Sequence, residues 1–289
     1  MFIVELFCHI DDFCKTFISD WESKLIEGGE KKRRRQRQLS ISEIMTILVA
    51  FHSSGFRTFK HFYSFLLTHH RDLFPSLVGY TRFISYIPSV IVPLTAYLNT
   101  RKGQVTGIGF VDSTAIAVCK NGRILSNRVF RGLAKRGKTT TGWFFGFKCH
   151  IIINDRGELL AFCITPGNTD DRVPLGEKLA KGVTGKLFGD KGYVSKELFE
   201  KLLSQGLTLF THIKKNMKNS LMPLIDKILL RKRSLVETVN DQLKNISQIE
   251  HSRHRSPTNF LVNFLCALIS YSHQPKKPSM NLDLGLIAP

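Results

Sequence analysis

Hydrophobic side chains follow a helical spacing through residues 1–100 of the chain. Apolar residues every three or four positions predict a helix over residues 1–27. A second helix is expected to begin at Ser40, because Ser40 and Glu43 have the spacing of a capping box ahead of an apolar run. A third helix fits residues 58–67, and a proline-punctuated helical stretch follows it. The pattern therefore predicts an all-α N-terminal domain over residues 1–100.

From residue 105 the pattern changes to short apolar runs separated by turn residues. Residues 108–118 form a long run of this kind and predict a buried strand. The elements expected after it are strands over 145–153 and 158–165, a helix over 174–181, a strand over 186–189, a helix over 195–205, a strand over 207–213, a long helix from Pro223 past Lys244, and a last helix over 258–272. This order is that of an α/β, ribonuclease-H-like fold, in which helices flank a mixed five-stranded sheet. We expect that domain to occupy residues 101–274 and a short mobile tail to occupy 275–289.

Charge narrows the class of partner. In 289 residues, 42 Lys and Arg against 23 Asp and Glu give a net charge of +19. An excess of this size indicates a polyanionic partner, with nucleic acid ahead of an anionic membrane surface. The segment over residues 119–141 is especially basic and rich in glycine, so we expect a loop or an irregular hairpin that faces nucleic acid.

Composition also bears on the compartment. The six cysteines include no CxxC pair and no zinc-type spacing with histidines, so we interpret them as reduced thiols. The most apolar run, residues 260–271, is shorter than the roughly 20 residues of a membrane helix. The acidic residues near the N-terminus do not fit an export signal. We expect a cytoplasmic protein with no membrane segment.

Two basic stretches of the N-terminal domain are candidates for DNA contact. The helices that begin near Ser40 and Thr58 have the outline of a helix-turn-helix, with Arg57 and Lys60 at the start of the second helix, where base-reading residues lie in that motif. The same outline is typical of any small helical bundle. The basic run over 31–37 fits either a solvated linker or a phosphate-contacting arm, in which Arg33, Arg34 and Arg35 would take part.

Three carboxylates are the candidates for chemistry. Asp112 lies inside the first predicted strand, Asp190 ends a later one, and Glu237 lies on the long helix. An unpaired buried carboxylate is too costly to stay ionised, so an aspartate inside an apolar strand indicates a bound cation. Carboxylates are the ligands that Mg²⁺ selects in proteins, and two such ions about 4 Å apart support in-line phosphoryl transfer.

The long helix carries basic residues on the same face as Glu237. Arg233 and Lys244 stand four residues before and seven residues after it. One interpretation is a solvated surface ion pair worth a few tenths of a kcal/mol. The other is a pair of phosphate contacts beside the carboxylates. On the same helix, Asn240 is a candidate to hydrogen-bond a metal ligand without contacting the metal itself.

Other charged residues have ordinary explanations as well as functional ones. Asp170 and Asp171 fit a helix N-terminus or a pair with Arg172. Lys148 alternates with His150 on one predicted strand face, where it fits either a sheet surface or a phosphate contact.

Five segments carry a resemblance to a known family. They are FVDSTAIAVC, GWFFGFKCHIIIND, TPGNTDDR, LFGDKGYVS, and SLVETVNDQLKN with HSRHRSPTNFLVNFLCALISY. Together they resemble the DDE transposases of bacterial insertion sequences, most closely the insertion-sequence 982 family, over about residues 40–273. The signature Y-x2-R-x3-E-x6-K of related transposases is met by Arg233, Glu237 and Lys244, whereas Leu230 stands at its tyrosine position. That departure leaves an aromatic contact to a terminal base without its residue.

The resemblance implies a function and a site. The acidic triad would fall on Asp112, Asp190 and Glu237, which would hold two Mg²⁺ ions, with Mn²⁺ as a substitute. The protein would bind double-stranded DNA at the element's terminal inverted repeats, cleave at the element ends, and join the freed 3′ hydroxyl to target DNA. A homo-oligomer in the synaptic complex and a bacterial, nucleoid-associated location would follow. Two other classes stay open: a nuclease of the same fold without strand transfer, and a catalytically silent DNA-binding protein derived from a transposase.

Overall fold

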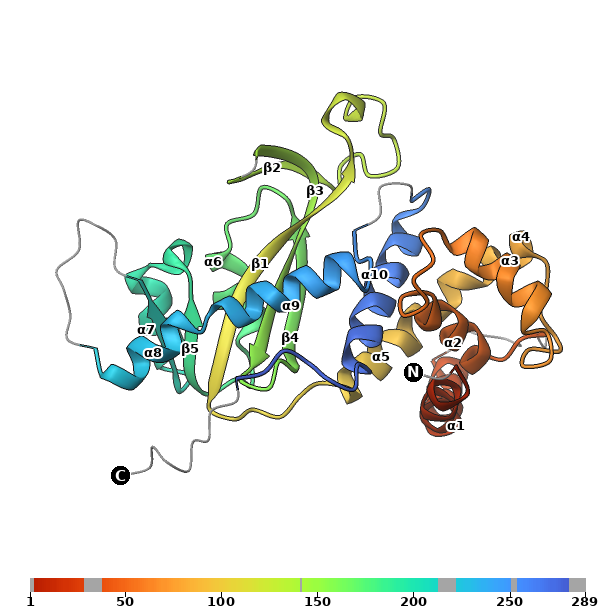
Figure 1. Ribbon diagram of the computed structural model, residues 1–289, viewed down its shortest axis with the longest axis horizontal. Helices are drawn as coiled ribbons and strands as arrows, with labels where there is room; N and C mark the ends of the chain where they lie inside the picture. Colours follow the sequence, from red (N-terminus) through yellow and green to blue (C-terminus); the bar gives the residue numbers. More distant parts are fainter. Residues whose placement is uncertain (1–2, 29–37, 141, 213–221, 251–253, 281–289) are drawn as a thin grey trace. The chain divides into compact units, whose positions relative to one another are not determined.

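The computed structural model describes residues 3–28, 38–140, 142–212, 222–250 and 254–280 (Figure 1). The chain divides into two compact units. The first contains Met1–Arg101, Leu243–Ile249 and His254–Pro275, and the second contains Lys102–Gln242, Glu250–Arg253 and Lys276–Pro289. The basic run over 31–37 and the end of the predicted tail, from residue 281, lie outside the described residues.

The first unit is helical. Its helices are α1 (Ile3–Glu27), α2 (Ile41–Phe51), α3 (Phe59–His69), α4 (Tyr80–Tyr86), the 3-10 helix η1 (Ile87–Val90), α5 (Ile91–Thr100) and α10 (Pro257–Ser272). The predicted capping box is confirmed, because the Glu43 backbone N–H donates to Ser40 Oγ at 3.0 Å and the Ser40 N–H donates to Glu43 Oε2 at 2.7 Å. Nearly all of α2 is buried, so this cap begins the helix at the centre of the unit.

Helix α10 differs from its predicted placement. The sequence order puts it at the end of the ribonuclease-H-like domain, but the structure groups it with the N-terminal helices, where it packs against α2, α5 and η1. Phe264, Ala267 and Leu268 are all buried in it. A helix that is apolar on most sides needs a core around it, and the apolar pattern alone does not tell which core that is.

The stretch Tyr80–Thr100 is long and apolar enough to cross a membrane by length and composition. It consists of α4, η1 and α5, with Pro88 and Pro93 inside it. Phe83, Val90 and Leu94 are fully buried. Because η1 and α5 contact α10, α2 and α1, the stretch forms part of the core of this unit.

The second unit contains a six-stranded sheet. Its strands are β1 (Ile108–Cys119), β2 (Lys135–Thr139), β3 (Gly142–Asn154), β4 (Leu159–Pro166), β5 (Gly185–Gly189) and β6 (Leu207–Thr211). β1 lies between antiparallel β3 and parallel β5, and β6 continues parallel to β5. On the side of β3 opposite β1, β2 pairs with the first residues of β3 and β4 pairs with the remainder. Without β2, this is the strand order and direction of a ribonuclease-H-like fold, as expected. β2 comes from the segment over 119–141 in which a loop or an irregular hairpin is expected.

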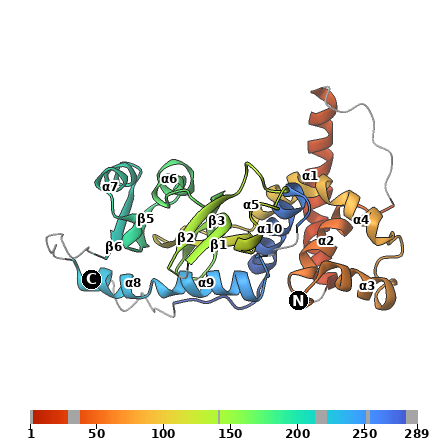
Figure 2. The ribbon, with the colours of Figure 1, turned by 90° about the horizontal axis from the view of Figure 1, so that it is seen from above.

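Helices cover both faces of this sheet. Helix α6 (Arg172–Pro174), the π-helical turn η3 (Leu175–Leu179) and α7 (Lys196–Leu203) lie on one side, and α8 (Leu224–Arg231) and α9 (Ser234–Asn245) lie on the other (Figure 2). Leu175, Leu187 and Leu202 are among the fully buried side chains that join η3, β5 and α7 into one core. The sheet is therefore a rigid support for whatever its strand ends carry.

The predicted long helix is two helices. It breaks at Lys232 and Arg233, where the Leu235 and Val236 N–H groups donate to the carbonyls three residues back. No proline or glycine marks the break, and the apolar pattern continues through it. The prediction of a single helix is wrong because the sequence carries no residue that marks the break. Glu237 consequently lies in the first turn of α9.

Candidate active site

Asp112 lies in the middle of β1, opposite Ile151 of β3. The two residues before it, Phe110 and Val111, are fully buried, so the strand that carries the carboxylate is anchored in the core. Asn240 of α9 donates from Nδ2 to Asp112 Oδ2 at 3.0 Å. A side chain from a helix on one face of the sheet thus fixes the orientation of this carboxylate.

The environment of Asp112 favours its protonated form. Burial raises its pKa to about 6, and the negative charge of Asp190 adds to the increase. The Ser113 backbone N–H, the Arg233 guanidinium and the Asn240 amide act in the opposite direction without cancelling it. The neighbouring donors and the Arg233 guanidinium therefore do not offset the cost of burying the ionised Asp112 carboxylate.

Asp190 follows β5, the strand parallel to β1. Phe110 pairs with Phe188 in the register of these strands, so Asp112 and Asp190 each lie two residues beyond the last paired position, at equivalent places that we call the shared edge. Asp190 begins the short 3-10 helix η4 (Lys191–Tyr193) and accepts the Gly192 N–H at 2.6 Å. Two acids from different strands therefore meet at one edge.

Glu237 is held by Arg233. Its Oε1 atom lies 2.5 Å from Arg233 Nη2, with 52% of the Glu237 side chain and 20% of the Arg233 side chain exposed. Asn240, one turn further along α9, is buried and reaches Asp112, and its Oδ1 atom has no hydrogen-bond partner among the residues that the structure describes. Arg233 is close enough to Asp112 to lower the pKa of that carboxyl. The start of α9 thus brings a carboxylate, a cation and an amide to the Asp112 edge.

Tyr193 belongs to the same edge and is not among the residues predicted from sequence. Its side chain is 1% exposed. Burial raises its pKa well above the ordinary value, and the nearby charges of Asp171, Asp112 and Asp190 act in the same direction. The signal was its place three residues after Asp190 in the segment LFGDKGYVS. Tyr193 is a neutral, buried wall of the site.

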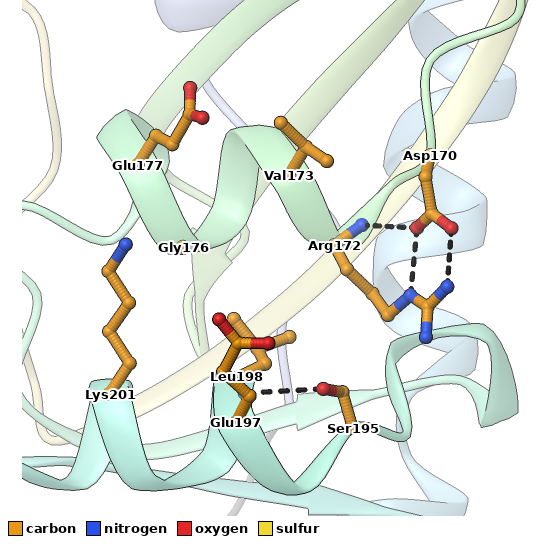
Figure 3. A pocket seen from close by; sticks show the side chains of 9 residues that line it. All are labelled: Asp170, Arg172, Val173, Gly176, Glu177, Ser195, Glu197, Leu198 and Lys201. Carbon is orange, nitrogen blue, oxygen red and sulfur yellow. Dashed lines mark hydrogen bonds and ion pairs between the residues drawn. The ribbon is translucent and has the colours of Figure 1, made fainter.

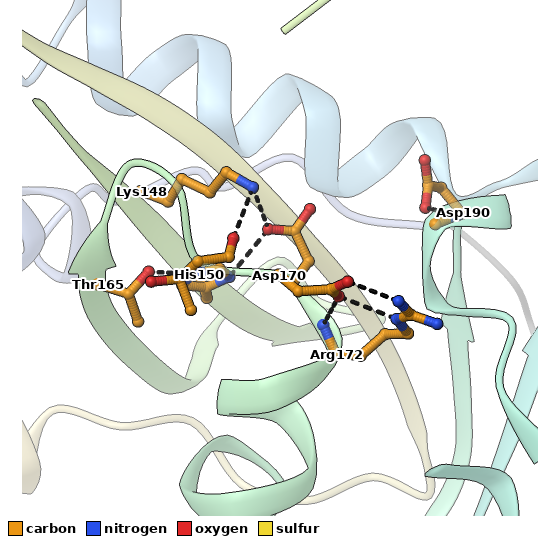
Figure 4. A network of polar contacts seen from close by, with 9 residues as sticks. Lys148, His150, Thr165, Asp170, Arg172 and Asp190 are labelled. Carbon is orange, nitrogen blue, oxygen red and sulfur yellow. Dashed lines mark hydrogen bonds and ion pairs between the residues drawn. The ribbon is translucent and has the colours of Figure 1, made fainter. Parts of the chain in front are cut away.

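A network of polar contacts lies beside these acids (Figure 4). Lys148 of β3 donates from Nζ to Asp171 Oδ1 and to the Thr169 carbonyl oxygen, both at 2.9 Å. His150, two residues along the same strand face, lies 3.8 Å from Asp171 Oδ1 and 2.8 Å from Thr165 Oγ1. Burial lowers the pKa of His150 to about 4, which keeps its ring neutral near pH 7. Lys148 is thus engaged by a carboxylate, with 15% of its side chain exposed, and a phosphate contact from it stays a prediction.

Asp170 takes one of the roles expected for it. Arg172 donates from Nε and Nη2 to its two oxygens at 2.9 and 2.6 Å, and its backbone N–H donates to it as well. These bonds lower the pKa of Asp170 to about 2. The pair with Arg172 is confirmed for Asp170, whereas Asp171 makes its ion pair with Lys148.

A cavity of about 390 Å³ lies between η3 and α7 (Figure 3). Asp170, Arg172, Glu177, Ser195 and Lys201 are among its lining residues. Its charges are mixed, and its lining contains none of the three acids of the predicted triad. The cavity therefore does not mark the candidate active site.

The other predicted DNA contacts are dispersed. Arg57 and Lys60 are both exposed, in the turn before α3 and in its first turn. Lys244 lies in the last turn of α9. Arg33, Arg34 and Arg35 lie outside the described residues.

The three predicted acids are not gathered around one point. Among the residues that the structure describes, no group of three or more His, Cys, Asp or Glu side chains is arranged to hold a metal ion. Asp112 and Asp190 share an edge, and Glu237 is turned into its ion pair with Arg233. The donor chemistry is that of a hard divalent cation, which carboxylate oxygens select.

Comparisons with known proteins complete this description. A family model described as a transposase DDE domain matches residues 102–257. Among solved structures, the chain is similar to the piggyBac transposase synaptic complex with hairpin DNA, at 12% identity and a TM-score of 0.44, over 93% of this chain and 72% of that chain. It is also similar to the simian T-cell lymphotropic virus intasome in complex with PP2A regulatory subunit B56 gamma, at 13% identity and a TM-score of 0.27, over 68% and 72% of the two chains. No curated protein matches the chain.

Proposed function

The chain belongs to the DDE transposases, whose domain model spans more than half of it, and we propose that it cleaves DNA at the ends of an insertion sequence and joins them to new DNA. In this proposal it binds the terminal inverted repeats, hydrolyses the phosphodiester bond at each end, and uses the freed 3′ hydroxyl to attack target DNA. The five segments that begin with FVDSTAIAVC support a place in the insertion-sequence 982 family. The protein would act in the bacterial cytoplasm, on the nucleoid, as a homo-oligomer that holds both ends.

The observation that carries the proposal is the shared edge of Asp112 and Asp190. Their equivalent places beyond paired residues of parallel strands keep two negative charges together. Such an arrangement costs stability unless a ligand supplies positive charge. A bound divalent cation would remove that repulsion.

The residues fit two Mg²⁺ ions in their chemistry. Asp112, Asp190 and Glu237 would be the ligands, and Mn²⁺ would substitute. When bound, the ions would activate the attacking oxygen and stabilise the leaving oxygen. The buried Asn240 Oδ1 atom, which has no partner within the described part of the chain, is a further polar atom available beside Asp112.

The chain's own residues would prepare this site. Asn240 holds Asp112 in one orientation through a 3.0 Å hydrogen bond. Arg233 is paired with Glu237, and if Glu237 served as a metal ligand the guanidinium would be available for a phosphate oxygen. The neutral, buried Tyr193 excludes water from the side next to Asp190.

The helical unit would supply repeat recognition. Thr58 caps α3 through its side chain, and Arg57 and Lys60 are exposed at the start of that helix. An exposed basic helix start suits contacts to phosphates and base edges. The integrity of this unit includes α10, so residues 1–100 alone would lack part of their core.

The test uses the full chain and labelled DNA that carries the flanking element ends. We expect Mg²⁺-dependent nicks at the end junctions and, with target DNA added, covalently joined products. Cleavage without joined products would favour the nuclease of the same fold, and binding without cleavage would favour the silent DNA-binding protein. Undiminished cleavage in chelator would contradict the metal-dependent mechanism.

A further inference from the structure

The hairpin of β2 and the start of β3 has two different faces. Lys138 pairs with Trp143 and Arg136 pairs with Phe145, and directly paired residues project to the same side of a sheet. Arg136, Lys138 and Trp143 therefore share one face, which we call the outer face. On the opposite side, a side chain at Gly137 would lie 2.2 Å from the Gly167 carbonyl oxygen. The inner side is thus closed by packing.

The outer face presents an aromatic ring between cations. Trp143 is 54% exposed. The Arg136 guanidinium carbon lies 5.5 Å from its ring centroid and the Lys138 Nζ atom lies 5.7 Å from it. Asn121 Nδ2 donates to the Trp143 carbonyl oxygen at 2.7 Å, which fixes the strand end. A large ring held out in this way exposes apolar area that packing would normally cover.

The charge around this face has one sign. Residues 113–154 contain eight Lys and Arg and no Asp or Glu. Seven of these cations are exposed: Lys120, Arg123, Arg128, Arg131, Lys135, Arg136 and Lys138. A run of exposed cations without acids attracts a polyanion such as nucleic acid.

We propose that the outer face binds an unpaired segment of DNA, with a nucleobase stacked on Trp143 and its phosphates on Arg136 and Lys138. Exposed aromatic rings beside cations suit unpaired bases, whose faces are open, whereas an intact duplex offers only its phosphates and groove edges. This inference rests on the proposed function, because it assumes that DNA is the substrate.

The outer face is distant from the chemistry along the sheet. Ile151, which pairs with Asp112, is eight residues after Trp143 on β3, a separation of about 26 Å along an extended strand. Trp143 therefore affects how DNA is held and leaves the chemical step unchanged.

The experiment follows the fluorescence of Trp143 in the full chain. The sequence has two tryptophans, so the background variant Trp21→Phe leaves Trp143 as the reporter. Its fluorescence is titrated with a single-stranded oligothymidylate and with a blunt duplex of equal length. We expect the single strand to quench the fluorescence and the duplex to leave it nearly unchanged, because only an open base stacks on the ring.

Binding variants test the same face by labelled-DNA affinity. Trp143→Ala should weaken single-strand binding roughly tenfold, and Trp143→Phe should retain most of it. The double variant Arg136→Ala and Lys138→Ala should reduce the salt slope by about 1.4, because two phosphate contacts are lost. The matched control removes two exposed cations elsewhere, Lys181→Ala and Lys196→Ala, and should change the slope less.

Each outcome is decisive. Equal quenching by both probes, or unchanged single-strand affinity in Trp143→Ala, overturns the inference. Mg²⁺-dependent cleavage of element ends by wild type, together with unaltered single-strand binding in Trp143→Ala, leaves the proposed function intact and rejects the stacking site alone. A wild-type chain that neither binds nor cleaves DNA overturns both.

Discussion

Two aspartates of the catalytic unit have opposite environments. Asp170 is paired with Arg172 by two side-chain hydrogen bonds, and its pKa is lowered to about 2. Asp112 is partly buried beside another acid with an amide as its side-chain donor, and its pKa is raised to about 6. Arg172 neutralises the charge of Asp170, whereas the charge of ionised Asp112 is not neutralised. The contrast favours the proposed ligand role for Asp112 and a structural role for Asp170.

The largest expected effect is on chemistry. Asp112→Asn and Asp190→Asn should each reduce cleavage of element ends by roughly a thousandfold or more, about 4 kcal/mol of barrier, because each removes a proposed metal ligand. Asp170→Asn should stay within about threefold of wild type. Single-turnover cleavage on pre-bound ends measures all three. Comparable losses in Asp112→Asn and Asp170→Asn would remove the distinction between the two aspartates.

The next effect is on stability in chelator. The pKa of Asp112 rises from 3.8 to about 6 on folding, so the folded chain binds this proton more tightly than the unfolded chain. The unfolding free energy is therefore highest below pH 4, falls as the pH rises from about 4 to about 6, and stays lower above that. The difference corresponds to roughly 3 kcal/mol at pH 7.

Asp112→Asn should remove this penalty. We expect its Tm at pH 7 to exceed that of wild type and its Tm to change less between pH 4 and pH 6. Asp170 has a lowered pKa, so its contribution is present above pH 4 and is lost only as the pH falls towards 2. Asp170→Asn is therefore the control. Parallel Tm profiles for wild type and Asp112→Asn would show that Asp112 carries no such strain.

A smaller effect separates the two arginine pairs. Arg233→Ala and Lys244→Ala should slow cleavage roughly tenfold, about 1.4 kcal/mol, while lowering stability by at most about 0.5 kcal/mol. Arg172→Ala is matched to Arg233→Ala, since it also breaks an arginine–carboxylate pair. If Arg233→Ala cleaves as fast as Arg172→Ala, Arg233 only forms an ion pair with Glu237 and makes no phosphate contact that matters for cleavage.

The smallest effect belongs to the Asp170–Arg172 pair itself. Its side chains are nearly half exposed, so solvent screens it, and Arg172→Ala should lower stability by less than about 1 kcal/mol. Chemical denaturation of the two proteins measures this difference. A loss several times larger would mean that the pair holds the loop before α6 in place.

The sequence predicted the sheet because apolar periodicity is a local property. β1, β3, β4, β5 and β6 each appear as a run of apolar or β-branched residues, and Asp112 and Asp190 stand out because they interrupt or end such runs. The shared edge of these two acids follows from the ribonuclease-H-like order once β5 lies beside β1.

Other features depend on contacts that local patterns do not carry. The partner of Lys148 lies in a loop 23 residues later, and Tyr193 looks like any core aromatic until Asp171 and Asp112 are placed beside it. β2 has few apolar residues and is a strand because it pairs with β3. The break before α9 has no marker residue, and α10 has no local sign of the core that it joins.

Divalent cations at Asp112, Asp190 and Glu237 are the basis of the proposed function. The most direct measurement is Mn²⁺ binding, followed by electron paramagnetic resonance with end-containing DNA present. Wild type and Asp170→Asn should retain bound Mn²⁺, whereas Asp112→Asn, Asp190→Asn and Glu237→Gln should lose it. Bound Mn²⁺ retained in all three variants would show that these carboxylates are not the metal ligands.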